Sequence, residues 1–250
     1  MLWYKVWRES SVRFLISATA IAGVCLVRVL FEQRFFPGVA HERPGVHNYI
    51  QYLYWTIFGA GGRGLLQLSC LLLGLGGLQR DRKQNTLFFT LALPISRPRL
   101  VVTRALVGFL QVFALSLLPP FIVWATSRLV HQSVPLSYGL SFIPFWTIGG
   151  FVTFGVTFLC SVLFTGEFTA LAVGFTSYVF YLALCQGDTQ FGQLYPLQVA
   201  DFMSGRLGNV IDTHTLLWTG NTSFILLAGF TLAAITLIAA SAFIATQQDL

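Results

Sequence analysis

The chain has 250 residues, of which 55% are hydrophobic and 15% aromatic, and only 10% carry a charge. Its mean hydropathy of +0.72 is well above that of soluble domains, so the composition excludes an ordinary water-soluble globular protein. Fifteen cations against nine anions give the net charge of +6. The cations flank apolar runs, which membrane topology explains, so we expect no nucleic-acid partner.

Six apolar runs are each long enough to cross a bilayer as a helix, which needs about 20 residues. They cover residues 14–31, 55–78, 101–127, 138–164, 167–186 and 222–245. A membrane barrel would instead need short segments of about ten residues with alternating polarity. We therefore expect an all-α polytopic membrane protein, with residues 1–250 forming a single transmembrane domain.

Residues 1–13 have the pattern of an amphipathic helix. Apolar residues fall on one face and charged residues on the other: Leu2, Trp3, Val6 and Trp7 against Lys5, Arg8 and Glu9. A helix of this kind, with tryptophans on its apolar face, is typical of one lying in the membrane interface. We expect such an interfacial helix before the first span; the alternative is a frayed basic tail.

The second run contains one cation in a glycine-rich stretch, FGAGGRGLL, residues 58–66. An ionisable residue inside a span is a functional hypothesis by default. If the helix starts near Tyr49, Arg63 lies in mid-span and can meet substrate in a transport path. If it starts near Ala60, Arg63 only reaches the outer interface. The glycines weaken a long helix and favour the second alternative.

Residues 79–100 gather five cations between two apolar runs: Arg80, Arg82, Lys83, Arg97 and Arg99. Each costs about 2.5–3.5 kcal/mol at the centre of a membrane helix, so this segment lies at the cytoplasmic surface. Asp81 suits the start of a short helix, and Pro94 ends it. Arg97-Pro98 predicts a second break before the third span.

Two explanations compete for this segment. The cations can anchor to anionic lipid, at about 1 kcal/mol each. Alternatively, the helix docks a protein, with apolar anchors such as Phe88 and Phe89 and a charged rim that sets the orientation. Lipid anchoring alone needs neither the apolar LFF sequence nor the proline stop, so the pattern favours docking.

The stretch RDRKQNTLFFTLALPISRPRLVVTR, residues 80–104, resembles the first cytoplasmic loop of ABC exporter permeases of the ABC-2 type. Members have an acidic residue, Gly-Thr, a leucine-rich turn ending in Pro-x-Ser-Arg, and a basic residue entering the next span. Here these places are held by Asp81, Asn85-Thr86, Leu87 to Leu93, Pro94 to Arg97, and Arg104. Asn85 departs from the usual glycine, and Asp81 from the commoner glutamate.

The resemblance implies a six-span permease whose loop carries a coupling helix seated in a groove of a separate ABC ATPase. The residues it assigns to this docking are Asp81, Arg82, Lys83, Thr86, Leu87, Phe88, Phe89, Pro94 and Arg97. It also implies work in pairs, with a second copy or a homologous permease subunit. ATP and magnesium would bind the partner ATPase, and no cofactor would bind this chain.

Three further features lie in or after the third run. Pro119-Pro120 predicts a kink near its outer end. At residues 165–167, Glu167 suits the first turn of a helix, and the resemblance makes it a second ATPase contact instead. Residues 187–220 form an outer loop that is either solvated or, as the resemblance implies, carries short re-entrant helices.

The distribution of cations predicts the orientation. Nine of the fifteen lie in or beside residues 1–13, 79–100, 165–167 and 246–250, and cation-rich loops stay in the cytoplasm. We therefore expect a multi-pass protein of the cell (inner or plasma) membrane with both termini cytoplasmic and membrane lipid around its spans. The apolar, aromatic spans favour a hydrophobic or amphiphilic cargo.

The chain has no motif of a nucleotide-binding enzyme. A P-loop needs a lysine directly after glycine, but Tyr4 precedes Lys5 and Arg82 precedes Lys83. The four cysteines, in separate apolar runs, form no CxxC pattern. We expect no enzyme and no metal site. Two alternatives stay open: a membrane enzyme or haem- or metal-carrying protein using its histidines, and a membrane anchor or immunity protein without a motor.

Overall fold

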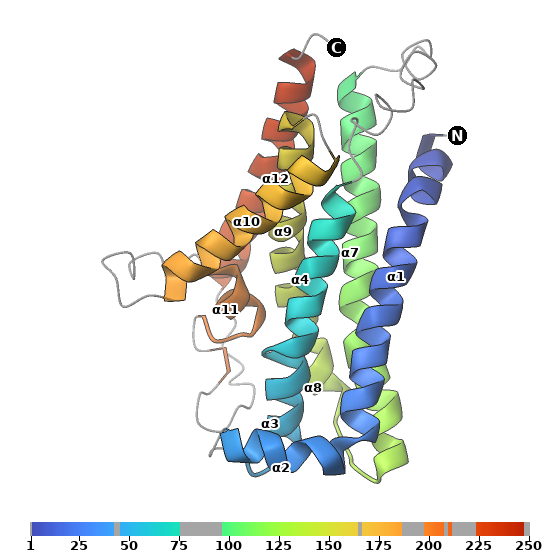
Figure 1. Ribbon diagram of the computed structural model, residues 1–250, viewed down its shortest axis with the longest axis vertical. Coiled ribbons are helices and arrows are strands. Elements are labelled where there is room, and N and C mark those ends of the chain that lie inside the picture. The colour runs from blue at the N-terminus through green and yellow to red at the C-terminus, as the bar shows by residue number, and fades with distance from the viewer. Residues whose placement is uncertain are drawn as a thin grey trace.

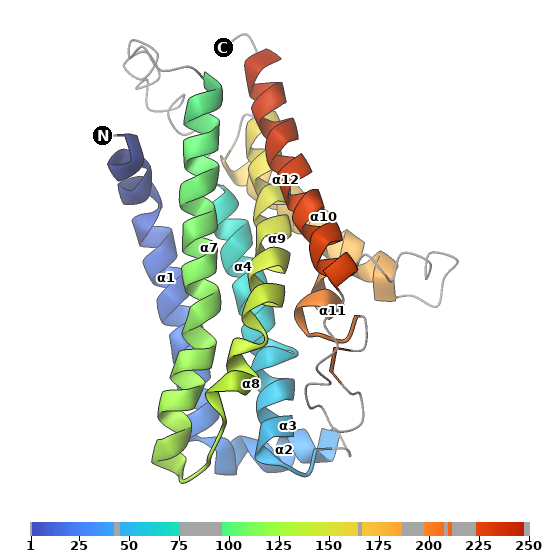
Figure 2. The same cartoon turned by 180° about the vertical axis from the view of Figure 1, so that it is seen from behind.

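The computed structural model describes residues 2–42, 46–75, 97–164, 167–186, 198–207, 210–211 and 224–247. Regular structure in these ranges is helical, and five segments, each a single helix or a run of consecutive helices, are long and apolar enough to cross a membrane. They stand side by side as a bundle (Figures 1 and 2). The expected all-α membrane architecture is therefore confirmed at this level.

The candidate spans follow the expected runs closely. They are formed by α1 (Leu2–Leu30), by α3 (Tyr49–Leu53), η1 (Tyr54–Phe58) and α4 (Gly61–Gly74) together, by α7 (Arg97–Ser127), by α8 (Leu136–Leu140) with α9 (Ile143–Leu163), and by α12 (Phe224–Gln247). The remaining run forms α10 (Glu167–Gln186), which crosses α9 obliquely (Figure 1) and is not one of the five. A sixth crossing stays a prediction.

Residues 2–13 are helical, but they do not form the separate interfacial helix that we expected. They continue without a break into the first apolar run, giving α1 a length of 29 residues. No glycine or proline interrupts this part of the sequence. The hydroxyl groups of Ser10 and Ser11 donate hydrogen bonds to Val6 and Arg8 carbonyls of the preceding turn, which is compatible with a continuous helix.

A short amphipathic helix lies elsewhere, across the end of the bundle away from the chain termini (Figure 1). This is α2 (Glu32–Glu42). Phe35, Phe36 and Val39 pack against the core, while Arg34 and His41 are exposed. The link between the first and second spans therefore runs as a helix along the surface of the bundle end.

The third span also starts differently from the sequence prediction. Arg97 and Pro98 do not form a break ahead of the span, because they belong to the first turn of α7, which begins at Arg97. Proline fits the first turn of a helix, where its missing N–H would have no intrahelical partner. The helix also continues through Pro119 and Pro120 to Ser127.

Glycines bring α4, α7 and α9 into close contact at the centre of the bundle. A methyl group on Gly108 of α7 would overlap the ring of Phe154 on α9. One on Gly150 of α9 would lie 2.7 Å from a methyl carbon of Val112 on α7. Small residues let membrane helices approach closely, where packing rather than hydrophobic burial holds them together.

Candidate functional site

The segment expected to dock the ATPase lies mostly outside the described residues. These are residues 76–96, which include Asp81, Arg82, Lys83, Thr86, Leu87, Phe88, Phe89 and Pro94. The described helices on either side place its ends: α4 ends and α7 begins in the part of the bundle where both chain termini lie (Figure 1). Arg97 begins α7 and Glu167 begins α10.

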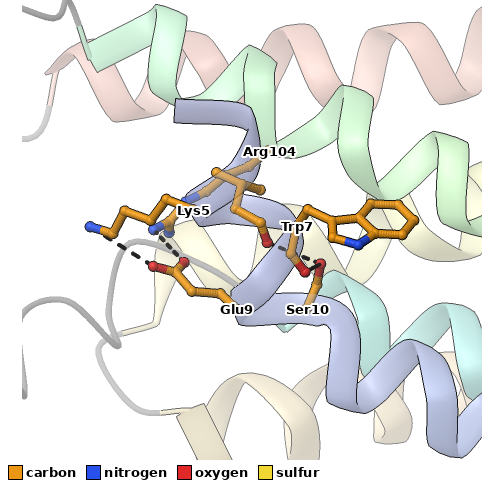
Figure 3. Close-up of polar contacts among 6 residues, drawn as sticks. Lys5, Trp7, Glu9, Ser10 and Arg104 are labelled. Atoms are coloured by element: carbon orange, nitrogen blue, oxygen red, sulfur yellow. Dashed lines mark hydrogen bonds and ion pairs between the residues drawn. The ribbon is translucent and has the colours of Figure 1, made fainter. Parts of the chain in front are cut away.

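Just beyond this segment, Arg104 connects α7 to α1. Its side chain is only 5% exposed, and its Nη2 lies 3.4 Å from Oε2 of Glu9, so the two form an ion pair (Figure 3). Glu9 also pairs with Lys5 of its own helix, at 3.8 Å, but Lys5 is 45% exposed. A buried cation needs such a partner, because an uncompensated charge there is strongly unfavourable.

A hydrogen-bond chain continues this contact about two turns further along α7. Nε2 of Gln111 donates to Oγ of Ser10 at 2.7 Å, and Ser10 donates to the carbonyl of Val6 at 3.0 Å. The same side chains, with Phe154 of α9, line a cavity of about 30 Å³. We call Glu9, Ser10, Arg104 and Gln111 the polar clamp.

The sequence did not predict the polar clamp as a unit. Arg104 was expected as the basic residue entering the third span, but Glu9 was placed only on the polar face of an interfacial helix. The two residues are 95 positions apart, and the distance between them depends on how α1 packs on α7. A carboxylate beside a long apolar run was the signal that could have marked Glu9.

Arg63 lies in the second span, at the start of α4. The candidate span begins at Tyr49, but α4, the helix that carries Arg63, begins at Gly61, after the π-helical turn η1 and an interruption at Gly59 and Ala60. A methyl group on Gly61 would lie 2.6 Å from the Thr56 carbonyl oxygen, so glycine is needed for the close approach there. Arg63 therefore lies in the first turn of α4, inside the candidate span Tyr49–Gly74.

The side chain of Arg63 reaches a short helix from the expected outer loop. Its Nη1 donates to the carbonyl oxygen of Ala200 at 2.7 Å, while its Nε has no partner among the described residues. Ala200 belongs to α11 (Val199–Met203), whose residues Phe202 and Met203 are fully buried. Residues 198–207 are thus packed into the bundle rather than solvated; residues 187–197, 208–209 and 212–220 lie outside the described part.

A second arginine holds the end of this segment. Nε of Arg206 donates to the hydroxyl of Tyr54 at 3.2 Å, and its guanidinium carbon lies 4.5 Å from the centre of the Trp55 ring. Tyr54 in turn donates to the carbonyl of Ser204 at 3.1 Å. The π-helical turn therefore presents its aromatic side chains to the segment that follows α11.

Next to α11 the bundle has a partly open cavity of about 620 Å³. It lies between α4, α9, α10, α11 and α12. Its walls are apolar for the most part and include Leu71, Val156, Phe230 and Ala233. Tyr178 of α10 is among its few polar lining residues.

Within the described ranges, no three residues among the histidines, cysteines, aspartates and glutamates come together as metal ligands. Comparisons of the chain with protein-family models, with curated proteins and with solved structures find no match.

Proposed function

We propose that this chain is the transmembrane permease subunit of an ATP-driven ABC exporter. It crosses the membrane six times, docks a separate ATPase through residues 79–100, and pairs with a second copy or a homologous subunit. Together the two permeases form the path of a hydrophobic or amphiphilic substrate. ATP and magnesium bind the partner, and this chain performs no chemistry.

The observation that carries the proposal is the placement of the ends of the cationic segment. The end of α4, the start of α7 and both chain termini lie at the same part of the bundle (Figure 1). That arrangement supports one cytoplasmic face, with α10 as the fifth crossing and α12 as the sixth. The ATPase would meet the chain on this face.

The polar clamp supports a mechanical role for the docking segment. A force applied to residues 79–100 acts directly on α7, which begins at Arg97. Since Arg104 and Gln111 bind Glu9 and Ser10, the same force acts on α1. Movement of the ATPase would thus shift two spans together rather than one, and reshape the space between paired permeases.

Co-purification tests the proposal. A tagged chain isolated from its native membrane is expected to bring down a P-loop ATPase. The double substitution Phe88→Asp and Phe89→Asp is expected to reduce the recovered ATPase at least about tenfold, because it puts two desolvated charges at the apolar anchors.

A matched control makes the same phenylalanine-to-aspartate substitution at the other end of the bundle. Phe31 is 53% exposed at the junction of α1 and α2, at the other end of the bundle, so Phe31→Asp is expected to leave ATPase recovery unchanged. Equal recovery from the double variant and the parent chain would contradict the docking proposal. A chain that brings down no ATPase at all would favour the anchor or immunity alternative.

A further inference from the structure

The outward face of α1 carries a row of exposed side chains along its first four turns. Their spacing of four, four and three residues puts them on one side of the helix: Tyr4, Arg8, Val12 and Leu15. The side chains of Tyr4, Val12 and Leu15 are 71%, 62% and 61% exposed, and Arg8 is exposed as well. Val6 and Ser17, by contrast, are buried in the bundle. We call the four exposed residues the outer stripe of α1.

The length of α1 places the outer stripe across the boundary between lipid headgroups and tails. The helix has 29 residues, about nine more than the roughly 20 that cross the hydrocarbon layer. Residues 14–27 carry no charge, whereas residues 5–13 carry four, so the surplus residues lie at the Leu2 end. Tyr4 and Arg8 therefore lie at the level of the headgroups, and Val12 and Leu15 at the level of the tails.

The cations in this part of α1 outnumber its single carboxylate. Glu9 is shared between Lys5 of its own helix and Arg104 of α7. Arg8 forms no ion pair with a carboxylate in the described ranges, and its side chain is exposed. A guanidinium at headgroup level thus keeps its donors for a phosphate, which arginine binds with two parallel hydrogen bonds.

A lipid fits the outer stripe better than a protein does. Pairing of two copies through this face would bring the two Arg8 side chains to one interface, where like charges repel each other. An acidic protein outside the membrane could meet Arg8, but it would not reach Val12 and Leu15 among the lipid tails. A molecule with an anionic head and a hydrocarbon chain meets both parts of the stripe.

We propose that the outer stripe of α1 binds an anionic phospholipid from the leaflet at the Leu2 end of the helix. The lipid phosphate meets the guanidinium of Arg8, and one acyl chain follows Val12 and Leu15. Tyr4 lies beside the headgroup, a level that suits its apolar ring and polar hydroxyl. The site belongs to α1 alone and does not depend on the proposed permease function.

Quenching of a fluorophore at one position measures which lipid lies there. Val12→Cys, in a chain that also carries Cys160→Ser and Cys185→Ser, would be labelled with bimane and placed in nanodiscs of phosphatidylcholine. Part of this lipid would then be replaced by phosphatidylglycerol or phosphatidylcholine with brominated acyl chains, which quench bimane. Phosphatidylglycerol is expected to bind at Val12 about fivefold more tightly, the factor that one cation contributes near an anionic lipid. Arg8→Gln is expected to remove most of this preference, and Arg8→Lys to retain it.

Ile235→Cys in α12 is the matched control for the position of the label. Ile235 is 59% exposed in a candidate span, and α12 contains no charged residue, so the two brominated lipids are expected to quench equally there. The same ratio of the two lipids at Val12 and Ile235, or a preference at Val12 that survives Arg8→Gln, would overturn the proposal. Quenching by both lipids at Ile235 but by neither at Val12 would also overturn it, because a protein such as a second copy would then cover the stripe.

Discussion

Arg104 is a buried cation near the start of α7, and its ion pair with Glu9 links α7 to α1. The two partners come from different helices, and the arginine is only 5% exposed while the glutamate is 33% exposed. The pair Lys5–Glu9 uses the same carboxylate but lies in one helix with an exposed lysine. These two pairs allow a direct comparison of a buried and an exposed ion pair.

Double-mutant cycles measure how much more the buried pair contributes to the free energy of unfolding than the exposed pair. The coupling free energy between Glu9→Gln and Arg104→Gln is expected to be about 0.5–3 kcal/mol, because water screens the buried guanidinium only weakly from the Glu9 carboxylate. The cycle with Lys5→Gln is expected to give less than about 0.5 kcal/mol, as for exposed pairs within a helix. Unfolding of the purified chain in denaturant provides the free energies. Equal couplings in the two cycles would show that the Arg104 pair contributes no more than a surface pair.

At the scale of helices, close packing of α4, α7 and α9 depends on individual glycines. Gly108 faces the buried ring of Phe154, whereas Gly23 in α1 faces open space. Both lie in helix interiors, where alanine is intrinsically favoured over glycine by about 1 kcal/mol. The two sites therefore differ in their surroundings rather than in backbone preference.

Replacing each glycine with alanine is expected to have opposite effects. Gly108→Ala should destabilise the bundle by about 1–3 kcal/mol, because the added methyl group forces Phe154 out of its place. Gly23→Ala should leave stability unchanged or raise it slightly. Thermal unfolding followed by tryptophan fluorescence would measure both. A stabilised Gly108→Ala variant would contradict the tight contact between α7 and α9.

The helices, but not their contacts, could be predicted from the sequence. Apolar runs such as residues 101–127 and 138–164 mark spans by local composition alone, and α7 and α9 lie where these runs are. Local composition also misplaced the amphipathic helix, since Ser10 and Ser11 allow α1 to continue and Phe35 and Phe36 pack α2 against the core.

The contacts of the candidate sites that the sequence did not predict join residues far apart in the chain. Arg63 meets Ala200, which is 137 positions away, and Arg104 meets Glu9 across 95 positions. The sequence marked both arginines as unusual but could not supply their partners, because those distances follow from helix packing. The interruption at Gly59 was anticipated from the glycines, although the π-helical turn before it was not.

At the scale of the whole molecule, the bundle has two distinct ends. Both termini, the end of α4 and the start of α7 lie at one, while α2 and the connection between α7 and α8 lie at the other (Figures 1 and 2). In the proposed orientation the first end is cytoplasmic. Exposed residues at each end make this orientation measurable.

Cysteine labelling of intact cells tests the orientation. A membrane-impermeant maleimide is expected to label Ser133→Cys, in the exposed connection after α7, from outside. It should label Gln247→Cys, at the end of α12, only after the membrane is permeabilised. A chain carrying Cys160→Ser and Cys185→Ser provides the background, since Cys160 is partly exposed, whereas Cys25 and Cys70 are fully buried. Labelling in the reverse pattern would place the cationic segment outside and contradict the permease proposal.

The unbroken length of α1 has one more consequence. At 29 and 31 residues, α1 and α7 are about 43 and 46 Å long, whereas the hydrocarbon layer is about 30 Å thick. Their charged residues gather toward Leu2 and Arg97, so the surplus turns project on that side. The pair of Glu9 and Arg104 joins these projecting turns of α1 and α7 beyond the hydrocarbon layer. A protein that binds them would tilt both helices together.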